Sequence, residues 1–287
     1  MKYLVTGVNG QLGYDVVKTL LASGVEKSDI CPTTSETMDI TNKDVVRRVI
    51  EKFKPSVIIH CAAWTNVDGA EDEKEMCLKV NYEGTKHLVD AAKKENASII
   101  VVSTDYVFDG KKDGIYEIDD SKNPQNVYGE SKNLAESYAL SYDKSFVVRT
   151  SWVFGINGKN FVKTMLRLAE TKTELNVVCD QVGSPTYTVD LAKFLVNLAA
   201  TNKYGIYHAT NEGYCSWAEF AKYIFTSNGK DVLVHEISTR EYPQKAVRPL
   251  NSRLSKKCLT DNGFDKLPTW QDAIDRYNKE LVLERKK

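Results

Sequence analysis

The sequence predicts an α/β protein in which a doubly wound parallel sheet is followed by a smaller α/β domain. Short apolar runs rich in β-branched residues alternate with amphipathic helical patterns up to about residue 150, as in parallel sheets with right-handed crossovers. A glycine-rich turn directly follows the first run. The alternation becomes less regular afterwards, so we assign residues 1–150 and 151–287 to two domains and expect a helix at about 187–201 to return to the first.

The expected elements follow from the period of the apolar residues. In the first domain we expect strands at residues 3–6, 29–33, 56–63, 97–102 and 145–150, and helices around 16–21 and at 42–52, 73–95 and 131–140. In the second we expect helices at 161–169, 188–200 and 270–281, strands near 177 and at 206–209, and a helix from Ser216 with a possible capping box to Glu219.

Composition excludes several classes of protein. The 287 residues are 42% hydrophobic, enough for a core without disulfides. Lys plus Arg equals Asp plus Glu at 39 each, so charge favours neither nucleic acid nor an anionic membrane as a partner. Six scattered cysteines, without metal-ligand spacing, indicate reduced thiols and no metal site. No apolar run approaches a membrane span of about 20 residues, so we expect a cytoplasmic protein.

Gly7, Gly10 and Gly13 are spaced G-x-x-G-x-x-G between the first strand and the first helix. Glycines in such a turn allow a sharp bend, close approach of a pyrophosphate, and tight packing of helix on strand. The phosphates would lie at the positive end of the helix. A ligand-free glycine loop is the alternative, but the flanking strand and helix favour dinucleotide binding. We therefore predict a Rossmann-type first domain.

The second strand ends in Thr33-Thr34, where a dinucleotide site often has an acidic residue for the ribose. A carboxylate there would repel a 2′-phosphate and an arginine would attract it, and neither is present. The cofactor is therefore predicted to be NADPH or NADH, with the choice open. Asp39-Ile40 is the next polar feature near the adenine, and the small pair Ala62-Ala63 follows the third strand.

Tyr128 and Lys132 are spaced i, i+4, which places both side chains on one face of a helix. An ammonium near a phenol favours the phenolate and lowers its pKa, so the pair could act as a general acid or base. On spacing alone, an ordinary exposed helical pair is the simpler interpretation. The preceding strand favours the chemical interpretation, because it ends in Ser103-Thr104-Asp105 at the edge where open α/β sheets bind ligands. The Thr104 hydroxyl could hydrogen-bond a carbonyl oxygen that gains charge during reduction.

Arg248 and Arg253 lie in a basic loop that could hold a phosphate, although most surface arginines have no such role. Together the motifs resemble the extended short-chain dehydrogenase/reductase family, and within it the dTDP-4-dehydrorhamnose reductase branch. The motifs that carry the resemblance are the glycine turn, Ser103-Thr-Asp-Tyr-Val-Phe-Asp-Gly110, Tyr128-x-x-x-Lys132, Arg149-Thr-Ser-Trp-Val153, Asp180-Gln-x-Gly-x-Pro-Thr186 and Arg248-Pro-x-Asn-Ser-Arg-Leu254.

The resemblance implies hydride transfer from the nicotinamide to C4 of dTDP-4-dehydro-β-L-rhamnose, giving dTDP-L-rhamnose. It implies catalysis by Tyr128 as proton donor with Lys132 and Thr104, and substrate contacts from Thr104, Asp105, Trp152 and Arg248. The implied cofactor contacts are Gly7, Gly10, Gln11, Leu12, Gly13, Asp39, Ile40, Ala62, Ala63, Trp64, Thr65, Tyr128 and Lys132.

Two alternatives stay open at this point. One is a reductase of another nucleotide-linked 4-keto-6-deoxysugar, since motifs do not fix which face of the ketone meets the nicotinamide. The other is a non-catalytic dinucleotide-binding module, resembling the regulatory subunit of methionine adenosyltransferase. Some relatives dimerise through Mg²⁺ held by carboxylates at an interface. Mg²⁺ is therefore possible here, but the sequence does not indicate it and no residues are matched to such a site, so we expect a monomer or a homodimer.

Overall fold

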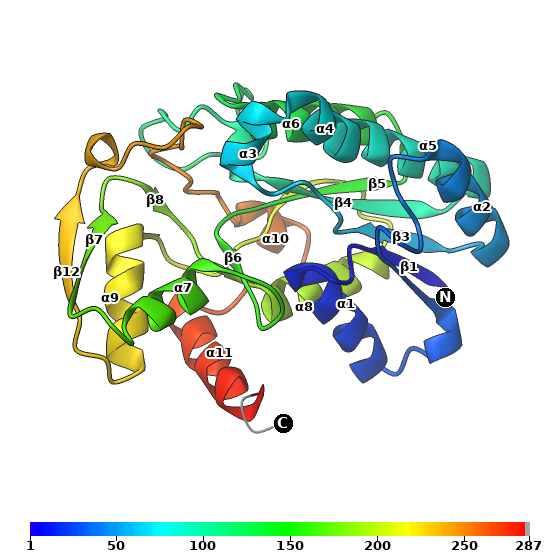
Figure 1. Ribbon diagram of the computed structural model, residues 1–287. Helices are drawn as coiled ribbons and strands as arrows, with labels where there is room; N and C mark the ends of the chain where they lie inside the picture. Colours follow the sequence, from blue (N-terminus) through cyan, green and yellow to red (C-terminus); the bar gives the residue numbers. More distant parts are fainter. Residues whose placement is uncertain (285–287) are drawn as a thin grey trace.

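A computed structural model describes residues 1–284, and its centre is a six-stranded sheet (Figure 1). The strand order is β10-β5-β4-β3-β1-β2, and every neighbouring pair is parallel. The strands are β1 (Tyr3–Thr6), β2 (Ile30–Thr33), β3 (Val57–His60), β4 (Ser98–Thr104), β5 (Ser145–Thr150) and β10 (Gly205–His208). Helices cover both faces of this sheet, so the predicted doubly wound α/β class is confirmed.

The two faces have separate cores. One lies against α1 (Gln11–Ala22) and α8 (Thr188–Ala199), which pack side by side. The other lies against α2 (Lys43–Phe53) and α5 (Gly84–Glu95), with α6 (Val127–Ala139) packed alongside. In Figure 1 these two groups of helices lie below and above the sheet. Each core joins the apolar stripes of its helices to strand side chains from one face of the sheet.

The strand order reverses between β1 and β3, since the chain runs from β1 to β2 on one side and returns to β3 on the other. Ligands bind parallel sheets at such a point, outside the carboxyl ends of the strands. The glycine turn follows β1, and Ala62 and Ala63 follow β3. The predicted cofactor residues therefore gather at this edge.

The rest of the chain surrounds a third apolar core. Its elements are α7 (Phe161–Leu168), α9 (Trp217–Ser227), α11 (Trp270–Glu284) and the parallel pair β7 (Glu174–Val178) and β12 (Leu233–Ile237). Helices α3 (Val67–Asp72) and α4 (Lys74–Leu78) lie between β3 and α5 and contact α6. The short elements in the second part of the chain are α10 (Lys257–Asp261), β6 (Val153–Phe154), β8 (Val182–Gly183), β9 (Thr186–Tyr187) and β11 (Cys215–Ser216). Strand β10 joins the central sheet although it follows residue 150, and the two-domain division stays a proposal.

Several element ends differ from those expected. Helix α6 begins at Val127 rather than 131, because the Asn126 side chain accepts a hydrogen bond from Gly129 N at 2.8 Å. Strand β4 continues through Thr104, and the helix expected at 73–95 is broken by a π-helical turn at Lys79–Glu83. The Ser216–Glu219 capping box is present as expected. Among residues 1–284, every helix falls short of the length and apolar character that a membrane crossing needs.

Candidate active site

The glycine turn leaves no room for side chains. A Cβ at Gly13 would lie 2.4 Å from the Gly7 carbonyl oxygen, and a Cβ at Gly7 would lie 2.8 Å from Ala62 Cα. Gly7 also has a φ of +69°, which favours glycine. Helix α1 begins after Gly10 with no side-chain cap and no acidic residue in its first turn. Its backbone N–H groups therefore suit an anion such as a pyrophosphate.

The loop after β3 is held against this turn by Thr6. Its hydroxyl accepts hydrogen bonds from Cys61 N at 3.1 Å and Ala62 N at 3.0 Å, and pairs with His60 Nδ1 at 2.8 Å. Burial lowers the pKa of His60 to about 3, so the ring is neutral. Thr6 and His60 thus shape the backbone along which the resemblance places a cofactor.

The other predicted cofactor residues occupy different positions around this edge. Asp39 is exposed and its carboxylate accepts from the Thr41 backbone and hydroxyl, while Ile40 is buried in the core. Leu12, in the first turn of α1, is buried in the core between this helix and the sheet. The Gln11 side-chain oxygen accepts hydrogen bonds from Gly155 N at 2.9 Å and from Asn160 Nδ2 at 3.0 Å. Thr65 is exposed and Trp64 is half-buried.

The loop at Trp64 is fixed by Asn81, from the π-helical turn. Asn81 Oδ1 accepts from Trp64 N at 2.8 Å, and its Nδ2 donates to Trp64 O at 3.1 Å. The same Nδ2 donates to Ser131 Oγ at 2.9 Å. Asn81 therefore links the predicted cofactor loop to the helix that carries Tyr128 and Lys132. No sequence pattern singles out Asn81, because only the fold brings Trp64 and Ser131 to it.

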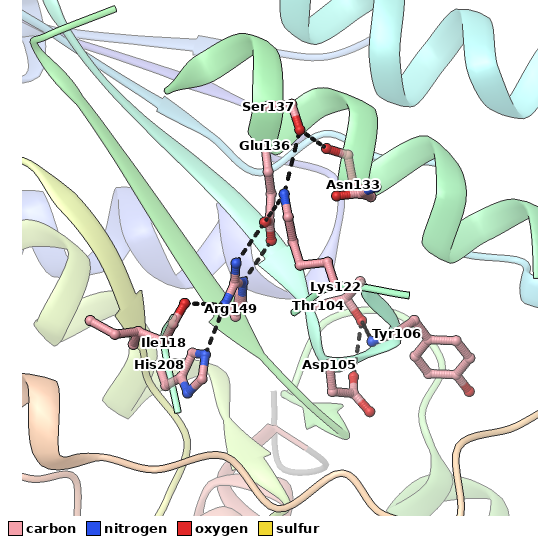
Figure 2. A network of polar contacts seen from close by, with 10 residues as sticks. All are labelled: Thr104, Asp105, Tyr106, Ile118, Lys122, Asn133, Glu136, Ser137, Arg149 and His208. Atoms are coloured by element: carbon pink, nitrogen blue, oxygen red, sulfur yellow. Dashed lines mark hydrogen bonds and ion pairs between the residues drawn. The ribbon is translucent and has the colours of Figure 1, made fainter. Parts of the chain in front are cut away.

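Thr104 and Asp105 form a buried polar pair at the end of β4 (Figure 2). Thr104 Oγ1 donates to Asp105 Oδ1 at 2.9 Å, and Ser252 Oγ donates to Asp105 Oδ2 at 2.5 Å. Burial raises the pKa of Asp105 to about 6, although both hydrogen bonds act against that shift. Ser252 comes from the Arg-Pro loop, so this loop reaches the end of β4.

Tyr128 lies next to this pair because a glycine lets α6 approach closely. A Cβ at Gly129 would lie 2.3 Å from the Tyr106 carbonyl oxygen. The rings of Tyr106 and Tyr128 meet edge to face, 5.5 Å apart. Burial raises the pKa of the Tyr128 phenol above its usual range, and a hydrogen bond with Thr104 partly offsets the rise. The phenol is therefore protonated at neutral pH.

Lys132 is buried one turn further along α6. Burial lowers its pKa to about 8, and the Glu136 carboxylate acts in the opposite direction. We expected Lys132 to lower the pKa of Tyr128. That expectation is wrong, because burial dominates at the phenol, and the neighbouring Asp105, Tyr106 and Cys77 raise its pKa further.

Trp152 and Arg248 lie on segments that extend beyond the sheet. Trp152 has a left-handed φ of +49° and stacks on Trp217 with ring centroids 3.6 Å apart. Arg248 Nη2 donates to Asp68 Oδ2 at 2.6 Å, and Nη1 donates to the Tyr106 hydroxyl at 3.2 Å. Arg248 is thus linked to Tyr128 through Tyr106. Asp68 and Trp217 carry no motif that would have predicted these contacts.

Comparison with known proteins places this site in a family. A family model described as the RmlD substrate binding domain matches residues 1–283. The chain belongs to this family. The dTDP-4-dehydrorhamnose reductase of Aggregatibacter actinomycetemcomitans is 45% identical to it over 287 residues, covering 95% of this chain and 97% of that relative.

Solved structures of the RmlD family agree with this assignment. A dTDP-4-dehydrorhamnose reductase from Clostridium acetobutylicum matches with a TM-score of 0.95 at 41% identity, covering 98% of this chain and all of that one. One from Bacillus anthracis, solved in complex with NADP, has a TM-score of 0.94 at 40% identity and the same coverage. The resemblance inferred from the motifs is therefore confirmed at the level of the family.

The glycine turn and its surroundings in this RmlD-family chain fit a dinucleotide. Neighbouring backbone fills the Cβ positions of Gly7 and Gly13, so only glycine fits this turn, and α1 begins beside it without a side-chain cap. At the end of β2, Thr33 and Thr34 supply neither a guanidinium nor a carboxylate to the site. The Thr33 hydroxyl donates a hydrogen bond to Val5 O at 3.2 Å. This end of the site suits NADPH and NADH alike.

Proposed function

We propose that the protein is an NADPH- or NADH-dependent oxidoreductase that reduces the C4 keto group of dTDP-4-dehydro-β-L-rhamnose to give dTDP-L-rhamnose. The observation that carries the proposal is the meeting of Thr104 and Tyr128 at the sheet edge that also holds the glycine turn. The names of the 45% identical relative and of the NADP-bound structure support the same reaction.

The cofactor, when bound, supplies the hydride. Residues of the chain then stabilise the negative charge that develops on the ketone oxygen and donate a proton to it. Tyr128 is the proton donor, and its raised pKa keeps the proton on the phenol until the oxygen becomes basic. Thr104 hydrogen-bonds the same oxygen by turning toward it the single hydroxyl proton that it otherwise donates to Asp105.

The remaining site residues hold the two ligands. Gly7, Gly10 and Gly13 present backbone to the pyrophosphate of the cofactor, and Lys132 lies one turn from Tyr128 on the same face of α6. Trp152 offers an aromatic surface for the sugar nucleotide. Arg248, with Tyr106 beside it, supplies a positive charge for the substrate diphosphate.

The test is oxidation of NADPH and of NADH at 340 nm with dTDP-4-dehydrorhamnose, with the product identified by NMR. Formation of dTDP-L-rhamnose is the expected result, and the two rates give the cofactor preference. A C4 epimer as product would keep the mechanism and change the product assignment. Cofactor binding without turnover would contradict the proposal and favour a binding module.

A further inference from the structure

A buried ion pair connects the helix of Tyr128 to the sheet (Figure 2). Arg149, on β5, donates from Nε to Glu136 Oε1 and from Nη2 to Glu136 Oε2, both at 2.9 Å. The side chains are 1% and 0% exposed. Two parallel bonds between a guanidinium and a carboxylate fix both groups in one orientation. The pair therefore holds α6 against β5.

The pair sits at the edge of the sheet where the chemistry is proposed. In the register of β4 and β5, Arg149 lies opposite Ser103, and Thr150 lies opposite Thr104. The third nitrogen of Arg149 donates to Ile118 O at 3.0 Å and to His208 Nε2 at 3.2 Å. All three side-chain nitrogens of Arg149 are therefore hydrogen-bonded. These bonds fix the guanidinium, which in turn holds the Glu136 carboxylate against β5.

Glu136 also belongs to the face of α6 that carries the reactive residues. Tyr128, Lys132 and Glu136 follow each other at intervals of four, so their side chains form one stripe. Lys122 Nζ approaches Glu136 Oε2 at 3.3 Å from the preceding loop. One buried carboxylate thus lies among the cations of Arg149, Lys122 and Lys132.

The other titratable groups that act on Lys132 in the described part of the chain are neutral at neutral pH. Burial raises the pKa of Cys61 to about 12 and raises that of Cys77. It lowers the pKa of His60 to about 3. Burial disfavours the ammonium of Lys132, and Glu136 is the largest influence that favours it.

We propose that Glu136, clamped by Arg149, is a positioning residue that sets the place of the Tyr128–Lys132 stripe and supplies the negative charge that keeps Lys132 an ammonium. This inference rests on the proposed function for its catalytic meaning, but the charge on Lys132 is a property of the protein alone. Arg149 supports this role by fixing the orientation of Glu136.

Three variants separate charge from packing. Glu136→Gln alone would leave Arg149 buried without its partner, so the decisive variant is the double change Glu136→Gln with Arg149→Met, which removes both charges together. Arg149→Met alone removes the clamp and keeps the carboxylate. Glu136→Asp keeps the charge on a shorter side chain.

The readout is the titration of Lys132 in the cofactor-free protein, followed by NMR of Cε-labelled lysine and assigned with Lys132→Gln. The double variant should titrate about one pH unit lower than the unmodified protein. Arg149→Met and Glu136→Asp should titrate at the original pH or above. An unchanged midpoint in the double variant, or a fall in either variant that keeps the carboxylate, would overturn the proposal.

The pH profile of turnover gives a second readout. Activity that needs an ammonium at Lys132 falls as the pH rises through its pKa. In the double variant the pH at which activity falls should be lower by the same shift of about one pH unit, and activity should recover when the pH is lowered. A purely structural pair would lower activity equally at every pH, which would contradict the proposal. Since the NMR titration needs no substrate, an incorrect substrate assignment would leave its result intact.

Discussion

The two halves of the candidate site are built in different ways. At the glycine turn the site is made of backbone, because the Cβ positions of Gly7 and Gly13 are blocked by the Gly7 carbonyl and by Ala62. At the junction of β4 and α6 it is made of buried polar side chains, with Thr104, Asp105 and Tyr128 in contact. The first half tolerates no added atoms, whereas the second depends on the chemistry of individual groups. Substitutions should therefore damage binding in one half and catalysis in the other.

The strongest test of this contrast is Tyr128→Phe, which removes one oxygen from the side-chain half. Turnover should fall by about two to four orders of magnitude, the range for a positioned general acid. The dissociation constant of NADPH, measured by fluorescence titration, should change little. A comparable loss of cofactor affinity would show that the two halves are not separate.

Asp105→Asn should change the pH dependence of stability. The pKa of Asp105 is raised to about 6 from 3.8, so the folded state holds its proton more tightly than the unfolded state. The unmodified protein should lose stability relative to the variant as the pH rises from about 4 to 6, by roughly 3 kcal/mol at most. Urea unfolding at pH 4 and pH 7 measures this. An equal difference between the two proteins at both pH values would contradict the raised pKa.

Gly129→Ala should harm catalysis through packing. The new Cβ would lie 2.3 Å from Tyr106 O, so α6 must move away from Thr104 at a cost of about 1–3 kcal/mol. We expect kcat to fall about tenfold or more, with the affinity for NADPH nearly retained. Steady-state kinetics at saturating cofactor provides the measurement. An unaltered kcat would show that close packing at Gly129 is not needed to place Tyr128.

Gly13→Ala is the matching change in the backbone half. Its Cβ would lie 2.4 Å from Gly7 O, which distorts the turn. The dissociation constant of NADPH should rise several-fold to tenfold, while kcat at saturating cofactor changes less. Gly24→Ala is the control, because no atom lies within 4 Å of its added Cβ and its φ of +84° disfavours alanine, so it strains the backbone away from the turn. Equal effects of the two changes on cofactor affinity would argue against a specific role of the turn.

The local sequence predicted much of the fold, because the apolar patterns that define strands and helices depend only on residues close together in the chain. The apolar runs of β1, β4 and β5 and the stripes of α2 and α8 lie close to the residues expected from their periods. The expected start of α6 at residue 131 was too late, because the Asn126 side chain caps the helix and Tyr128 already lies in its first turn. The π-helical turn had no signal in the period, yet it places Asn81 against the Trp64 loop.

The sequence by itself determined the alternation of strands and helices, the glycine turn, and the shared face of Tyr128 and Lys132, since each depends on residues close together in the chain. Only the tertiary structure decided which groups meet these residues. It brought Ser252 to Asp105 and Arg149 to Glu136, and its burial raised the pKa of Tyr128 where spacing alone had suggested a lowered one. The physical reason is that contact across the chain and removal from water depend on the packing of distant segments, which no local pattern encodes.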